Sequence, residues 1–322
     1  MADPGPKQHH YLPEFYLNGF ANDKGLLWIY DWKMDQYREQ SPHNTCKENN
    51  FNTLYDEDGN RVLDAETFYS IIEGLGKSVI DDLRANKSLD GQQISDLAYF
   101  VACMYSRIPA FREMYIKGAD SIYKQVLKSS VRTKEDAVRF MKGDATDPQA
   151  VLDFIHNEKF NIVPHQNVII QNAVEMAAKL HEIFSSQEWL VLSCDPKKSF
   201  VTSDAPLTRF ASSGFRPMGP GGGLGVSIPG VEKRIPLAAG VFLVILDQGE
   251  RTRYRDIDHL AVRHLNLCTA ARSDRFLIAR DRALLENLVN KVREQHRHGY
   301  QVSTQFIRDD DGRGGFGVLS QE

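Results

Sequence analysis

The sequence predicts an α+β fold in which a central helical layer lies between an N-terminal β element and a C-terminal mixed β-sheet. Three observations support this prediction. Strand-forming runs lie near the N-terminus, and apolar residues recur at helical spacing through the middle third. In the last third, short β-rich runs alternate with prolines and glycines. We expect one domain over 1–310, with the β element at 10–60, the helical middle at 64–186, the mixed α/β part at 187–310, and a flexible tail at 311–322.

The N-terminal part combines a short helix with a hairpin. A helix is predicted from Pro13 to Gly19, because proline is tolerated at a first helical turn and apolar residues recur along the segment. Residues 26–30 are rich in strand formers, and residues 36–40 are expected to return as their hairpin partner.

Helical periodicity dominates the middle of the chain. Asp64 is a predicted N-cap, and the helix after it carries an apolar stripe of Phe68, Ile71, Ile72, Leu75, Val79 and Leu83. Asp90 and Gln93 resemble a capping box before a second helix, which Pro109 kinks or ends. More helix is predicted to about residue 129, and then over 133–141, 148–155 and 165–184.

After residue 187 the pattern changes to short strands. The apolar run 236–246 is too short for the roughly 20 residues of a membrane span and indicates a buried strand. The remaining predicted elements are strands at 189–193, 199–202, 240–246 and 275–279, a loop at 214–225, and helices at 256–269 and after Asp281.

Composition excludes several classes of protein. Lys and Arg number 39 against 43 Asp and Glu, a net charge of −4, so the chain as a whole is not drawn to nucleic acid or to anionic membranes. The four cysteines form no CxxC pair, which disfavours structural zinc. Residues 1–10 lack the apolar stretch of a secretory signal, so we expect a cytoplasmic protein with no membrane partner.

Several motifs along the chain resemble a bacterial family, domain of unknown function 4238. They are His10-Tyr-Leu-Pro-Glu-Phe-Tyr-Leu-Asn-Gly-Phe20, 26-Leu-Leu-Trp-Ile-Tyr-Asp-31, Glu48 before Phe51, Ser106-Arg-Ile-Pro109 and Phe200-Val-Thr-Ser-Asp-Ala-Pro206. The His-x-x-Pro-x-Phe opening and the Thr-Ser-Asp-x-Pro turn are the most specific of these. The resemblance implies candidate positions and no activity. Since the pattern spans both ends, we expect the two ends to meet.

Five residues of these motifs are candidates for chemistry. His10 suits a general base because imidazole titrates near neutral pH, although capping or packing explains it equally well. Asp204 sits on a turn after a strand, where loops hold catalytic groups, although an Asx-turn also explains it. Glu48 is the third catalytic candidate, and Asp204 with Glu48 are the predicted metal ligands. Arg107 and Ser203 are predicted to bind substrate, although Arg107 equally suits an internal ion pair.

Other charged positions are expected to be solvated. Glu66 and Glu73 share one side of a helix opposite its apolar stripe, and His9 lies outside the motif. Two basic stretches, 251–255 and 291–298, are the predicted footprints for a polyanion.

We expect His10, Glu48, Arg107 and Asp204 to gather in one pocket of an intracellular hydrolase, a phosphodiesterase or nuclease that uses a divalent metal such as Mg or Mn. Its partner would be nucleic acid or a phosphate-bearing substrate. The alternative is a non-catalytic binding or regulatory module, in which the same residues form a buried polar network. A third hypothesis, acyl transfer through Ser203 with His10 as base, lacks a recognisable oxyanion site.

Overall fold

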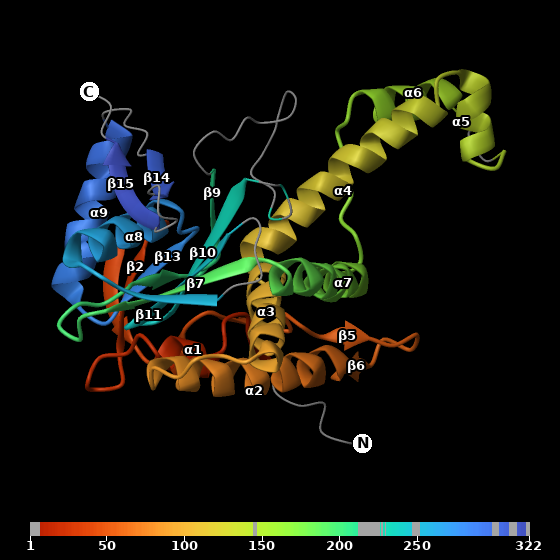
Figure 1. Cartoon of the computed structure of the whole chain (residues 1–322). Coiled ribbons are helices and arrows are strands. Elements are labelled where there is room, and N and C mark those ends of the chain that lie inside the picture. Colours follow the sequence, from red (N-terminus) through yellow and green to blue (C-terminus); the bar gives the residue numbers. More distant parts are fainter. Residues whose placement is uncertain are drawn as a thin grey trace.

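The structure is a computed structural model that describes residues 7–143, 147–211, 226, 228, 230–246 and 252–297, and the backbone of two later strands, Ser303–Arg308 and Gly314–Leu319. It is a mixed α+β protein with N-terminal strands and a C-terminal mixed sheet, as predicted (Figure 1). The predicted loop at 214–225 lies outside the described residues.

A five-stranded sheet forms the centre of the molecule. Its strand order is β12, β7, β11, β10, β9, and every pairing is antiparallel except that of β12 with β7. The strands are β7 (Glu188–Cys194), β9 (Thr208–Ala211), β10 (Val231–Ala238), β11 (Val241–Leu246) and β12 (Thr252–Ile257). The apolar run 236–246, predicted as one strand, belongs to two strands joined by a tight turn, because consecutive strands that are both buried give one unbroken apolar run.

Side chains alternate between the two faces of this sheet. Trp189 and Val191 of β7 face a large core shared with helices, whereas Leu190 and Leu192 face a smaller core shared with α8 (His259–Ala271). Both faces are therefore covered. The predicted helix at 256–269 begins later than expected because its first residues belong to β12.

A four-stranded sheet joins the two ends of the chain. Its order is β3, β2, β13, β8, so the predicted hairpin pairs with strands from the C-terminal part instead of forming a separate element. These strands are β2 (Leu27–Asp31), β3 (Gln36–Gln40), β8 (Thr202–Ser203) and β13 (Phe276–Ala279). β8 is shorter than the predicted strand at 199–202. Helix α9 (Arg282–Arg297) packs beside it.

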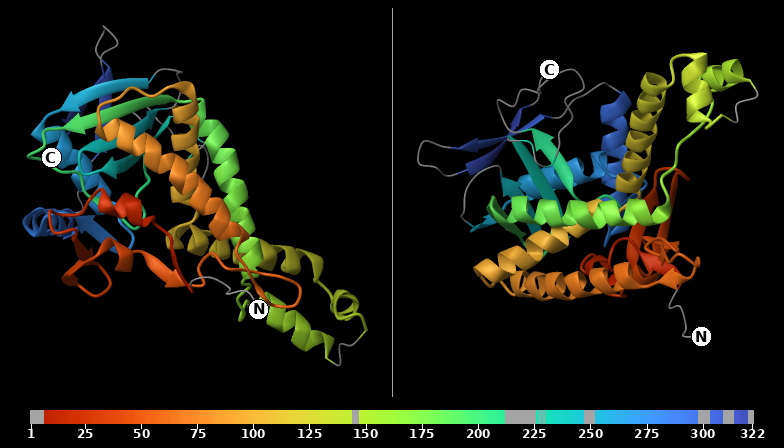
Figure 2. Two further views of the ribbon diagram at one scale, coloured as in Figure 1. Left: turned by 90° about the horizontal axis from the view of Figure 1, so that it is seen from below. Right: turned by 90° about the vertical axis from the view of Figure 1, so that its right-hand side faces the viewer.

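The long helices match the predicted segments closely. They are α2 (Asp64–Arg84), α3 (Gly91–Ser106), α4 (Pro109–Ser130), α5 (Lys134–Phe140), α6 (Pro148–His156) and α7 (Gln166–Ser185). The Asp90/Gln93 capping box is present, and α3 ends just before Pro109. Figure 2 shows the far half of α4 projecting from the body with α5 and α6 at its tip. No helix in the described part of the chain combines the length and apolar character of a bilayer span.

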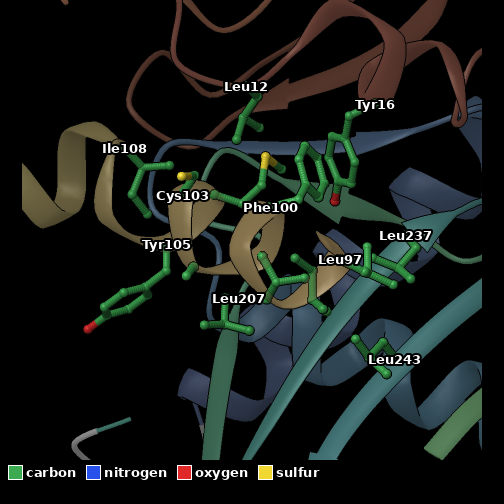
Figure 3. Close-up of a cluster of buried hydrophobic side chains, with 14 of the residues drawn as sticks. Leu12, Tyr16, Leu97, Phe100, Cys103, Tyr105, Ile108, Leu207, Leu237 and Leu243 are labelled. Atoms are coloured by element: carbon green, nitrogen blue, oxygen red, sulfur yellow. The ribbon is translucent and has the colours of Figure 1, made fainter. Parts of the chain in front are cut away.

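The buried face of α2 is rotated relative to the apolar stripe that the sequence predicted. Ile71 and Leu75 are exposed, whereas Tyr69 and Gly76 are buried against the core. Gly76 makes this rotation possible because a Cβ there would lie 2.4 Å from Cγ of Phe100 on α3, so only glycine lets the two helices approach this closely. Phe100 itself belongs to the core cluster in Figure 3.

The remaining elements are short. They are α1 (Glu14–Asn18), the 3₁₀ helix Pro42–Asn44, the strand pair β1 (Gln8–His10) with β4 (Lys47–Asn49), and the pair β5 (Leu54–Tyr55) with β6 (Arg61–Val62). The strand Gly314–Leu319 pairs antiparallel with Ser303–Arg308, where the sequence indicated a flexible tail at 311–322.

The two ends of the chain meet, as the family pattern predicted. The hydroxyl of Tyr16 donates to the carbonyl oxygen of Pro236 at 2.7 Å and lies 2.7 Å from the Thr202 hydroxyl. Because a phenol has a single proton, Thr202 must be the donor in the second bond. This buried bond links the opening motif to the Thr-Ser-Asp-x-Pro turn.

Candidate functional site

Asp204 is held at the end of β8 by the backbone of the opposing segment. Its two carboxylate oxygens accept N–H bonds from Asp274 at 3.2 Å and Arg275 at 2.9 Å, and its own N–H donates to Phe276. The side chain is buried. Burial disfavours the charged form more strongly than these N–H donors favour it, so the pKa of Asp204 is raised to about 7. The turn therefore positions a carboxyl group that titrates near neutral pH.

Two buried groups of the N-terminal segment accompany Asp204. Tyr11 and Cys46 are joined by a backbone bond from the Tyr11 N–H to the Cys46 carbonyl, 2.9 Å long. Burial raises the pKa of both side chains, and the charge of Asp204 raises each further. The Cys46 thiol is thus kept protonated, which disfavours it as a nucleophile. Sequence reasoning missed both residues, although Tyr11 lies inside the opening motif.

Arg107 is paired with Glu73. Its Nη1 donates to Oε1 of Glu73 at 2.6 Å, and its guanidinium lies over the Tyr69 ring. The interpretation of Arg107 as an internal ion-pair partner is therefore supported. The expectation that the Glu66 and Glu73 face is solvated is wrong, since Glu66 also bonds, to the side-chain amide of Asn52 at 2.8 Å.

Strand alternation places His9 and His10 in different environments. In β1, His9 faces inward and is buried, accepting the Asn52 N–H at 3.0 Å, whereas His10 is half-exposed. His10 donates through Nε2 to the His43 carbonyl at 3.0 Å. Burial lowers the pKa of His10. The prediction that His9 is solvated is wrong.

Glu48 and Ser203 occupy opposite environments. Glu48 is exposed on β4, whereas Ser203 is fully buried and its Oγ accepts the Ala205 N–H at 3.3 Å. The role of Ser203 in substrate binding stays a prediction.

The predicted constellation is not assembled by direct contacts. Within the described residues, no hydrogen bond or ion pair joins any two of His10, Glu48, Arg107 and Asp204. The part of the chain that the structure describes also holds no group of three His, Cys, Asp or Glu side chains arranged for a metal ion. The pair Asp204 and Glu48 thus lacks a third protein ligand, and we derive no step through a metal.

A cleft of about 300 Å³ lies beside Asp204. Three segments line it: the junction of α3 and α4, the chain from Ala205 to Arg209, and the end of α8 up to Asp274. Ile108 and Ala205 bring two of the family motifs to its wall. We call it the Arg209–Arg272 cleft, after the two guanidinium groups among its lining residues. In Figure 3, Tyr105, Ile108 and Leu207 lie at this edge of the core.

Neither arginine of the cleft has an ion-pair partner among the described residues. The guanidinium of Arg209 lies 5.9 Å from the centre of the Tyr105 ring, and that of Arg272 lies 5.1 Å from the centre of the Phe210 ring. Asp274 is the carboxylate among the lining residues, and its backbone N–H connects the cleft wall to Asp204. Sequence reasoning missed both arginines. Alternation in β9 marks Arg209 as outward-facing, but no local signal relates it to Arg272.

Some cations of the two basic stretches predicted to bind a polyanion already form ion pairs. Arg253 pairs with Glu188 and Arg293 with Asp35, so these cations are already neutralised. Arg251 and His298 lie outside the described residues. A different groove of about 660 Å³ carries basic residues instead, including Lys197, Lys198, Arg263 and Arg280. We call it the α8–α9 groove.

The fold and this site define an α+β protein with a cleft that is lined by two arginines and by residues from two of the motifs. The sequence model of a family described as "Protein of unknown function (DUF4238)" matches residues 8–283. The chain belongs to this family. Comparison with curated proteins and with solved structures gave no match.

Proposed function

We propose that this protein is a non-catalytic binding module that holds a phosphate-bearing small molecule in the Arg209–Arg272 cleft. The observation that carries the proposal is the pair of guanidinium groups without carboxylate partners in a cleft of about 300 Å³, a size typical of small-ligand pockets. Guanidinium donors match the geometry of phosphate oxygens. Of the residues predicted as catalytic, Asp204 accepts backbone N–H bonds from Asp274 and Arg275 and so supports one wall of the cleft.

We expect pyrophosphate, used as a minimal phosphate-bearing probe, to bind saturably in isothermal titration calorimetry at fixed ionic strength. Arg209→Gln and Arg272→Gln should each lower its affinity about 10-fold or more, because a hydrogen bond to a charged group contributes about 1.5–3 kcal/mol. Arg263→Gln removes a charge from the α8–α9 groove and is the matched control. Loss of affinity in the control alone, or no binding at all, would contradict the proposal.

A second candidate is a hydrolase of phosphodiesters, including nucleic acid. Asp204 supports it, because a carboxyl group whose pKa lies at about 7 is suited to accept a proton at neutral pH, and its N–H partner Asp274 lines the cleft. The assay is hydrolysis of bis(p-nitrophenyl) phosphate and single-stranded DNA with Mg or Mn. Turnover that falls at least 100-fold in Asp204→Asn, and also falls in Glu48→Gln, would favour this candidate. Equal turnover in both variants and the parent would reject it.

A further inference from the structure

A second, much smaller cavity lies on the other side of the α3–α4 junction. Its volume is about 10 Å³, room for one water molecule or one monatomic ion. Its lining includes Ser106 and Arg107 at the end of α3, Arg112 in the first turns of α4, and Asn52 and Tyr69. It is separate from the Arg209–Arg272 cleft, although Ile108 and Phe111 contribute to both.

Buried donors in this cavity lack partners. Nε and Nη2 of Arg107 and the Oγ of Ser106 are buried without a hydrogen-bond partner, and the Arg107 side chain is only 2% exposed. Buried polar groups are almost always bonded, since leaving one unsatisfied is costly. The single bond from Arg107 to Glu73 uses Nη1, so Nε and Nη2 of this cavity-lining guanidinium remain without partners.

The electrostatic surroundings favour a negative occupant. Arg112 adds a second guanidinium, which lies 4.0 Å from the centre of the Phe51 ring and donates to the Phe51 carbonyl. The cavity also meets the N-terminus of the 22-residue helix α4, where Ile108 supplies no side-chain cap and Pro109 has no N–H. Uncapped N–H groups and the helix dipole attract anions at such an end. Glu73 offsets one of the two cations, and the exposed Glu48 acts on Arg112.

We propose that this cavity binds one small monatomic anion of the halide class, held by Arg107, Arg112 and Ser106. The ion accepts hydrogen bonds from the unpartnered guanidinium donors and so connects the end of α3 to the start of α4. Because the same junction forms one wall of the Arg209–Arg272 cleft, the ion fixes that wall whether or not the proposed ligand of the cleft is correct.

The test uses the full-length protein and bromide as the probe. A crystal grown or soaked in sodium bromide should show an anomalous difference peak between Arg107 and Ser106. In thermal denaturation at constant ionic strength, replacing gluconate, which is too large for the cavity, with chloride should raise the unfolding midpoint by about 2–5 °C in a saturable manner.

Variants test whether the chloride response arises at this cavity. Ser106→Ala and the charge-balanced pair Arg107→Met with Glu73→Gln should lose most of the chloride response, whereas Arg84→Gln, an exposed arginine on α2, should keep it. A cavity that holds only water, seen as the absence of an anomalous peak, would overturn the proposal. Equal midpoints in chloride and gluconate, or a chloride response that persists in both cavity variants, would overturn it as well.

Discussion

Replacing Gly76 with alanine is expected to lower the free energy of unfolding by about 1–3 kcal/mol. The added Cβ would lie 2.4 Å from Cγ and 2.5 Å from Cδ2 of Phe100, whose ring is itself buried. The ring cannot move aside without disturbing the packing of α2 on α3. Overpacking outweighs the gain of about 0.5–1 kcal/mol that alanine gives over glycine in a helix interior. Urea unfolding followed by circular dichroism measures the change.

Gly74 supplies the matched control on the same helix. It is exposed, and a Cβ there meets no atom within 4 Å. Gly74→Ala should therefore raise stability by about 0.5–1 kcal/mol, because only the helix propensity changes. Opposite signs for the two substitutions are the expected outcome. A stabilising Gly76→Ala would show that α2 and α3 do not approach as the structure has them.

The second large expected effect is the pH dependence that Asp204 gives to the stability of the folded protein. Its pKa is raised to about 7 in the folded protein, above its value of about 3.9 in an unfolded chain. The native state therefore retains a proton that the unfolded state loses. Its contribution to stability is fully present below about pH 4 and is lost as the pH rises through about 7, a change of about 4 kcal/mol in total.

Asp204→Asn removes this titration while keeping the side-chain shape. Relative to the parent, the variant should gain stability steadily between pH 4 and 7 and show no further gain above that range. Comparing urea midpoints of the two proteins across the pH range cancels the other titrating groups. Asp153→Asn, a change at an exposed carboxylate on α6, should give a nearly constant difference. If the parent instead became more stable relative to the variant as the pH rises, the N–H donors of Asp274 and Arg275 would be keeping Asp204 ionised.

Local patterns predicted the elements better than their partners. The Asp90/Gln93 capping box and Pro109 placed the ends of α3 and the start of α4, because capping and proline effects act within a few residues. The hairpin β2–β3 was also predicted, but its pairing with β13 was not, because strand partners distant in sequence leave no local mark. The turn after Ala238 was missed for a related reason, since two consecutive strands that are both buried read as one apolar run.

The sequence predicted some residues of the candidate site by their type, but it did not predict how the fold arranges them. Asp204 lies on the predicted turn, and the structure adds its backbone donors and raised pKa. His10 was favoured over His9, because the one-residue register that turns His9 inward depends on the pairing of β1 with β4. Arg209 and Arg272 belong to no motif, and only the fold brings them to one cleft.

The Arg209–Arg272 cleft is expected to bind a phosphate-bearing ligand. The most direct measurement is hydrogen–deuterium exchange with and without saturating pyrophosphate. Protection is expected in the three segments that line the cleft, 105–111, 205–209 and 271–274, because ligand binding restrains their backbone. Protection confined to the α8–α9 groove around Lys197 and Arg263, or no change in exchange anywhere, would contradict it.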